Sequence, residues 1–170
     1  MEEENQILIS NAGISILWPF LPKYFEHLGF VNDGQFVNDE SRNRALYLLH
    51  YLAYNAINFP EEYLPFNKIL VGMPIDHSVE EIEEITPYEE ELSKSLLGGL
   101  IHNWSKVQDS SPEAIQETFL QRDGLITVHP EYNLLVVEKR GVDVLMESIP
   151  WNLSVIKLPW MVEAMKIEWV

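Results

Sequence analysis

The chain opens with a long region in which apolar residues recur at three- and four-residue spacing, the period of an amphipathic helix. This spacing predicts helices over residues 14–28, 39–54 and 87–104, and proline-containing start signals predict two shorter helices over residues 66–71 and 110–120. Pro19 and Pro22 interrupt the first stripe, so regular helix is expected to begin near one of these prolines, which the first helical turn tolerates. Gly29 is a suitable C-terminal stop for that helix.

The predicted helix over residues 87–104 carries the clearest start signal. Thr86 and Glu89 form a capping box, with a proline at the first helical position between them. Gly98 and Gly99 lie inside the same helix, where each costs roughly 1 kcal/mol relative to alanine. We therefore expect another element to approach the helix closely at this glycine pair.

After residue 124 the pattern changes to the short, β-rich runs that are typical of strands. Residues 125–128 and 133–138 are rich in β-forming side chains and are separated by a proline-containing turn, which predicts a hairpin. The alternation of residues 165–170 predicts a final strand. Residues 7–9 predict a short edge strand near the start of the chain.

The order of these elements predicts one α+β domain over residues 1–170, with N-terminal helices packed against a small C-terminal antiparallel sheet. Residues 1–10 are expected to form a short N-terminal arm or edge strand. Residues 11–124 are expected to be mainly helical, and residues 125–170 mainly strands. The length is usual for one domain and is sufficient to bury a core.

Two proline–tryptophan pairs, at residues 150–151 and 159–160, bracket an apolar run that predicts a short strand over residues 153–158. Each proline fixes its own φ angle and favours extended backbone in the residue before it. Two interpretations of the indoles stay open. Trp151 and Trp160 are both core anchors, or one of them, in particular Trp160, anchors a partner protein.

Composition narrows the functional classes. The chain has 11 basic and 27 acidic side chains, a formal net charge of −16, which argues against nucleic acid because phosphate contacts need clustered lysine and arginine. The same charge is compatible with a basic partner surface. Cysteine is absent, which excludes disulfides and thiolate chemistry. No apolar run approaches the roughly 20 residues of a bilayer-spanning helix, so direct membrane insertion is not expected.

Motifs for catalysis, metals and cofactors are missing from the sequence. The five histidines have no zinc-binding spacing, and neither a nucleophile elbow nor a phosphate- or dinucleotide-binding glycine loop is present. Asp76 and His77 are adjacent and could act as an acid–base pair in a hydrolase, although neighbouring side chains diverge. We predict no catalytic, cofactor-binding or metal-binding residue. The enzyme class therefore has little support.

Several sequence blocks, taken in order, resemble a known family. They are NAGISILWPFLP at residues 11–22, RALYLLHYLA at 44–53, LPFNKILVGMP at 64–74, FLQR at 119–122, and the region 138–169 with its two proline–tryptophan pairs. Together they resemble the C-terminal conserved region of contractile injection system tape measure proteins. The resemblance spans nearly the whole chain.

This resemblance implies a structural protein of a phage-tail-like particle, in which a contractile sheath drives a rigid inner tube. The implied partners are the tube, its initiator or the baseplate hub, with a homo-oligomer possible and assembly in the bacterial cytoplasm. Family members typically carry further sequence ahead of this region, whereas only ten residues precede Asn11 here. A fully helical chain of this length would span roughly 250 Å. We therefore expect a terminal fragment or a compact relative that docks without measuring length.

The leading hypothesis is a non-enzymatic docking domain. Aromatic residues and methionine are favoured at the centres of interfaces, and the candidate interface residues are Trp151, Lys157, Trp160, Met161 and Trp169. Lys157 could neutralise a buried acid, contact a partner carboxylate or extend its ammonium group from a strand edge. The alternative hypothesis is a small-molecule binding module with an aromatic-lined groove near Gly98 and Gly99.

Overall fold

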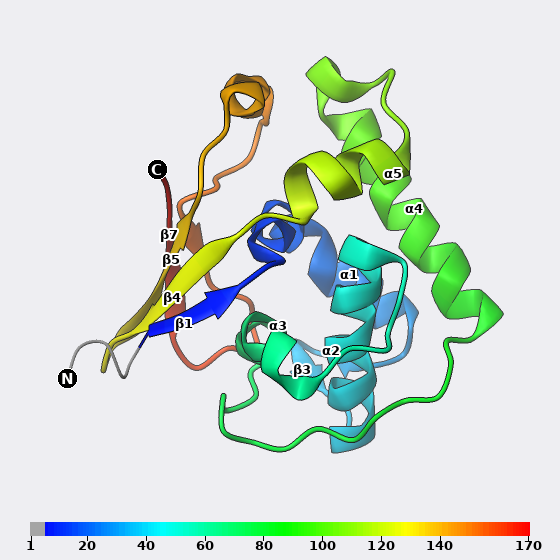
Figure 1. Ribbon diagram of the computed structural model, residues 1–170. Helices are drawn as coiled ribbons and strands as arrows, with labels where there is room; N and C mark the ends of the chain where they lie inside the picture. The colour runs from blue at the N-terminus through cyan, green and yellow to red at the C-terminus, as the bar shows by residue number, and fades with distance from the viewer. Residues whose placement is uncertain (1–5) are drawn as a thin grey trace.

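A layer of helices covers one face of a five-stranded sheet in the computed structural model, which describes residues 6–170 (Figure 1). The α-helices are α1 (Leu21–His27), α2 (Asp39–Tyr54), α3 (Pro65–Leu70), α4 (Pro87–Asn103) and α5 (Pro112–Ile115). Short 3-10 segments are η2 (Ala12–Phe20), η3 (Glu61–Tyr63), η4 (Ser105–Val107) and η6 (Gly141–Ser148), and η5 (Gln116–Leu120) is a π-helix. The arrangement confirms the predicted α+β class.

The main sheet has the strand order β1-β4-β5-β7-β6. Its strands are β1 (Gln6–Ile9), β4 (Gly124–Val128), β5 (Tyr132–Val137), β6 (Val155–Ile156) and β7 (Ala164–Trp169). A separate two-stranded hairpin consists of β2 (Val31–Asn32) and β3 (Gln35–Phe36). The hairpin of β4 and β5, the final strand β7 and the edge position of β1 are all confirmed. The first five residues of the predicted arm lie outside the described residues.

The prediction of an antiparallel sheet is wrong at one pair of strands. β5 and β7 run parallel, and Leu135 lies opposite Ile167 in their register. The chain between them passes through η6 and then through the edge strand β6, which runs antiparallel to β7, so β7 returns in the direction of β5. A connection of this length permits parallel pairing, which a tight turn does not.

The predicted strand over residues 153–158 shrinks to the two residues of β6. The Asn152 side chain accepts a hydrogen bond from the Ser154 N–H at 2.8 Å and donates one to the Val155 carbonyl at 2.8 Å. Such local side-chain bonds compete with the strand ladder for backbone groups. At the other end, Pro159 has no N–H to donate.

The helices of this layer begin where their local sequence signals predict. Regular α-helix begins at Leu21, so Pro22 lies in the first turn, and the residues before it form the 3-10 segment η2. The capping box at the start of α4 is confirmed: Thr86 Oγ1 accepts from the Glu89 N–H at 3.1 Å, and Glu89 Oε1 accepts from the Thr86 N–H at 2.8 Å. The same carboxylate receives two hydrogen bonds from the Arg44 guanidinium, at 2.5 and 2.8 Å, which ties α4 to α2.

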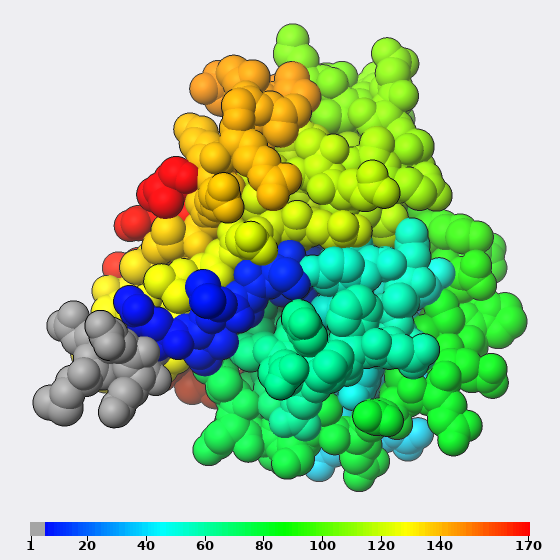
Figure 2. Space-filling model, viewed as in Figure 1, coloured from blue at the N-terminus to red at the C-terminus, as the bar shows by residue number. Residues whose placement is uncertain are grey.

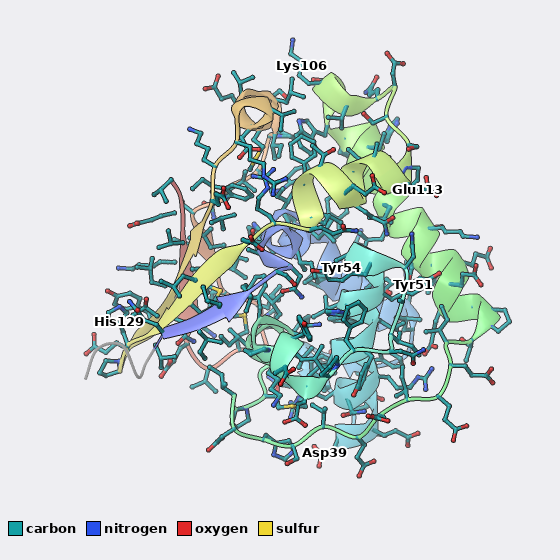
Figure 3. All side chains as sticks on the ribbon, in the orientation of Figure 1. Asp39, Tyr51, Tyr54, Lys106, Glu113 and His129 are labelled. Carbon is teal, nitrogen blue, oxygen red and sulfur yellow. The ribbon has the colours of Figure 1, made fainter. Side chains whose placement is uncertain are left out.

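A buried histidine lies among aromatic rings on α2. The imidazole of His50 is fully buried and packs against Phe59 and Tyr54, with ring centroids 4.1 and 4.6 Å apart. Neither ring nitrogen has a hydrogen-bond partner among the described residues. Tyr54 lies on the side of α2 that faces β1 and bonds the Ser10 hydroxyl at 2.6 Å (Figure 3). Burial lowers the pKa of His50 to about 4.

Acidification is therefore expected to destabilise the protein through His50. The unfolded chain takes up a proton near pH 6.5, whereas the folded imidazole stays neutral until about pH 4, so this contribution is complete above pH 6.5 and falls away below it. The loss should reach about 3 kcal/mol at pH 4. Urea unfolding at a series of pH values measures it. His50→Phe should flatten the curve between pH 6.5 and 4.5, and an unchanged curve would show that His50 does not cause the dependence.

Candidate functional site

Indole hydrogen bonds hold the two proline–tryptophan pairs against the helical layer. Trp151 Nε1 donates to the Ile16 carbonyl at 3.0 Å, and Trp160 Nε1 donates to the Leu70 carbonyl at 2.7 Å. Each bond joins segments far apart in the sequence. The C-terminal segment is therefore fixed on α3 and η2.

Trp160 is a core residue. Its side chain is only 5 % exposed and packs against the rings of Phe36 and Phe25, with centroids 5.1 and 5.7 Å away. The backbone of Gly72 passes so close that a Cβ there would lie 2.6 Å from the Trp160 carbonyl oxygen, and its φ is +73°. Glycine is required at this position for both reasons.

The other candidate interface residues lie at different depths. Met161 is buried, whereas Trp151 and Trp169 are half-buried at the surface. The Trp169 N–H has no partner among the described residues, and the Arg122 guanidinium lies 5.6 Å from the centre of its ring. Lys157 is exposed, and its ammonium group donates to the Met161 carbonyl. Within residues 6–170 it pairs with no acid, so a role in neutralising a buried carboxylate has no support.

An apolar groove of about 650 Å³ opens beside Met161, between the sheet and the loop after α3. Its lining residues are Ile7, Ile69, Gly72, Met73, Pro74, Ile75, Asp76, Val128, Asn133, Met161, Val162 and Glu163. Val162 is 88 % exposed at its edge. Asn133 is almost fully buried, and its Oδ1 has no hydrogen-bond partner among the described residues. The groove therefore combines a mainly apolar lining with two carboxylates, Asp76 and Glu163, and one unsatisfied amide oxygen.

Asp76 and His77 do not converge on one site. Asp76 lines the apolar groove, whereas His77 lines a second cavity, of about 610 Å³, beside the start of α2. That cavity is bordered by four carboxylates and two arginines, at Asp39, Glu40, Glu80, Glu81, Arg42 and Arg44. The geometry offers no acid–base pair at these two adjacent residues.

A buried ion pair was missed by the sequence reasoning. Arg122 and Asp143 are both fully buried and form two hydrogen bonds, at 2.6 and 2.9 Å. The guanidinium also donates to the carbonyls of Glu138 and Thr118, at 3.0 and 2.6 Å. Burial alone would raise the pKa of Asp143, but hydrogen bonds from Arg122 and from the Arg140 N–H hold it below its ordinary value. The only sequence signal was the place of Arg122 in the FLQR block.

The glycine pair in α4 has no close neighbour that explains it. A Cβ at Gly98 would meet no atom within 4 Å, and at Gly99 the nearest is a Phe20 ring carbon at 3.8 Å. The expectation of a close approach is therefore wrong. Neither glycine lines the two larger cavities described above, so the proposed aromatic groove at this pair gains no support.

Gly98→Ala is therefore expected to stabilise the protein by about 1 kcal/mol, because alanine fits the helix and reduces the freedom of the unfolded chain. Urea unfolding measures the gain. A loss of stability would mean that the glycine serves a contact absent from the described residues.

The comparisons with known proteins address the whole chain rather than single residues. The family model described as contractile injection system tape measure protein matches residues 1–169. The chain belongs to this family. Neither the curated proteins nor the solved structures that were searched include a match.

The described part of this tape measure family member contains no helix that is both long and apolar enough to span a bilayer. The same residues contain no group of three or more histidine, aspartate or glutamate side chains placed to hold a metal ion. What the fold of this tape measure family member does present is the apolar groove, with its exposed Val162. Trp151 and Trp169 are half-buried at the surface as well.

Proposed function

We propose that this tape measure family member is a structural docking domain that acts by protein–protein contact and not by catalysis. Its partners are the inner tube, the tube initiator or the baseplate hub of the injection particle, and it joins them during assembly in the bacterial cytoplasm. The observation that carries this proposal is the family match over residues 1–169. Membership in a family of contractile particles supports a role in assembly with other particle proteins.

The apolar groove is the docking site that we favour. An exposed valine at its edge, Val162, and a buried unsatisfied amide at Asn133 suit an apolar partner segment whose backbone supplies a hydrogen bond. Trp151, Trp169 and Lys157 remain candidate contacts around it because they reach the surface. Trp160 and Met161 have buried side chains, so in this proposal they hold the segment beside the groove in place and do not contact the partner directly.

Val162→Asp tests this proposal. The side chain is 88 % exposed, so the change should leave the free energy of unfolding within about 0.5 kcal/mol of the original. A charge at the edge of the groove should nevertheless sharply reduce the number of particles that assemble, as counted by electron microscopy of the strain that carries the variant. Trp160→Ala is a poor test because a large core cavity would unfold the protein.

Val37→Asp is the matched control, since Val37 is also exposed, at 51 %, but is not one of the residues that line the groove. Particle number and tube length should stay normal in this strain. Normal particles with Val162→Asp would remove the groove as a docking site. Normal particles after deletion of the whole gene would overturn the proposed function itself.

A further inference from the structure

The face of the sheet that points away from the helices is open. Figure 1 shows every labelled helix on one side of strands β1, β4, β5 and β7. The side chains of Leu125, Leu134 and Val136 point to the other side, since they alternate with the buried Ile126 and Leu135. They are half-buried, but they do not belong to the apolar residues that pack on the core.

The strand register gathers these side chains into an apolar patch. Leu8, 80 % exposed on β1, lies beside Leu125, which lies beside Val136 on β5. In the next row Thr127 lies beside Leu134. In the space-filling view, β1 and the adjoining strands form the left flank of the molecule, with the helical layer to the right (Figure 2).

Two side chains of opposite charge lie on the same open face, next to the apolar patch. Lys166 and Glu168 are exposed on β7 and lie in register with Leu134 and Val136. The ammonium group of Lys166 is 4.3 Å from the centre of the Tyr132 ring. The face therefore carries one positive and one negative side chain, two residues apart on one strand.

The charge of the chain is distributed unevenly around this face. Residues 1–124 contain 7 basic and 21 acidic side chains, a net charge of −14, whereas residues 125–170 contain 4 and 6, a net charge of −2. Two molecules that approach through their helical layers would repel each other strongly. Through the open faces, the two sheets would be about 10 Å apart, and each acidic helical layer would lie a further layer behind. The distance between the two acidic helical layers therefore exceeds the Debye length of about 8 Å at physiological salt, so their repulsion is screened.

We propose that the open face packs against the same face of a second copy of this chain. A two-fold axis that lies between the sheets and crosses the strands at the level of Ile167 would place Lys166 of each copy opposite Glu168 of the other. It would also place Val136 of each copy opposite Leu134 of the other, and Leu125 opposite Thr127, in two sheets that face each other as in a β-sandwich. A uniformly basic or acidic partner would satisfy only one of the two charges. The inference deepens the proposed function, because it assigns to the particle component a self-association surface separate from the groove.

The patch is small compared with the roughly 800 Å² per partner of a standard interface, so the dimer is expected to be weak. A dissociation constant on the order of 10–100 μM is expected for the isolated chain. In an assembled particle, where copies are held close together, effective concentration would favour the contact.

Sedimentation velocity of the purified chain at physiological salt tests the proposal, at protein concentrations on the order of 10–100 μM. The original chain should shift from monomer to dimer. Leu8→Asp and Leu134→Glu should each weaken the dimer at least about tenfold, since each places a charge in an apolar interface. Val162→Asp should not change it, because that residue lies in the groove.

Charge reversal provides the sharper test. Lys166→Glu and Glu168→Lys should each weaken dimerisation, because each places like charges opposite one another. The double variant should restore it, since both pairs then have opposite signs again. Recovery of the dimer in the double variant is expected only if residue 166 of one copy faces residue 168 of the other, as in packing through the same face.

A chain that stays monomeric over this range would overturn the proposal. So would a dimer that survives Leu8→Asp and Leu134→Glu, or a double charge reversal without recovery. These measurements use the isolated chain and test only the dimer. The chain could therefore prove monomeric while Val162→Asp still reduces particle assembly, which would leave the proposed docking function intact. Conversely, a confirmed dimer would stand even if normal particles form without the gene.

Discussion

Gly13→Ala is expected to remove most of the stability of the fold. A Cβ at position 13 would lie 1.6 Å from the Phe119 carbonyl oxygen and 2.6 Å from the Leu120 Cα. Both obstacles are backbone atoms of η5, so no change of rotamer relieves the clash. The 3-10 segment η2 and the π-helix η5 would have to separate, and the Ala12 N–H, which donates to the Arg122 carbonyl at 2.9 Å, would move with them. A cost of at least about 3 kcal/mol follows.

Urea unfolding followed by circular dichroism measures this cost. Gly98→Ala is the matched control, because the same change is made where a Cβ meets open space and is expected to stabilise. The two variants should therefore move the midpoint in opposite directions. A Gly13→Ala protein within about 1 kcal/mol of the original would show that η2 and η5 do not pack this closely in solution.

Asp143→Asn is expected to have the second large effect, a loss of about 3–5 kcal/mol. The substitution keeps the shape of the side chain but leaves the fully buried guanidinium of Arg122 without its counter-charge. That guanidinium also donates hydrogen bonds to two backbone carbonyls, those of Thr118 and Glu138. Loss of the pair therefore loosens the end of η5 and the end of β5 together. Thermal and urea unfolding above pH 5, where the carboxylate is charged, measure the effect.

Glu90→Gln provides the control for this variant. Glu90 forms an ion pair with Lys94 at 3.2 Å, but both side chains are largely exposed, so its loss should change stability by less than about 0.5 kcal/mol. The double change Arg122→Met with Asp143→Leu should be less harmful than Asp143→Asn, because it leaves no buried charge. An Asp143→Asn protein as stable as the Glu90→Gln protein would contradict the assigned role.

The candidate site was predictable only in part. The two proline–tryptophan pairs identified the segment that closes the C-terminal part of the fold, and their indole N–H groups do bond distant backbone. Whether an indole faces the core or a partner depends on what covers it. For Trp160 the cover consists of Phe25 and Phe36, which come from an earlier part of the chain, and no spacing rule joins them. Trp160 is therefore a core residue, and a docking role for the exposed candidates stays a prediction.

Local signals explain which elements the sequence alone determined. The capping box at Thr86, the helical period of α2 and the β4–β5 hairpin all depend on residues a few positions apart, and the structure contains each of them. The linear order of motifs also sufficed to recognise the tape measure family, since such a match compares residues in sequence. These features need no knowledge of packing.

Tertiary structure decided the rest, because each remaining feature depends on segments that meet only after folding. The parallel pairing of β5 with β7 follows from the route of the intervening chain, and the Arg122–Asp143 pair joins residues 21 positions apart. The open sheet face exists because the helices pack on one side only (Figure 1). Alternation along β4 and β5 predicts that one side of the strands is buried. Only the packed fold shows that, among residues 6–170, the leucines of the other side do not pack on the core.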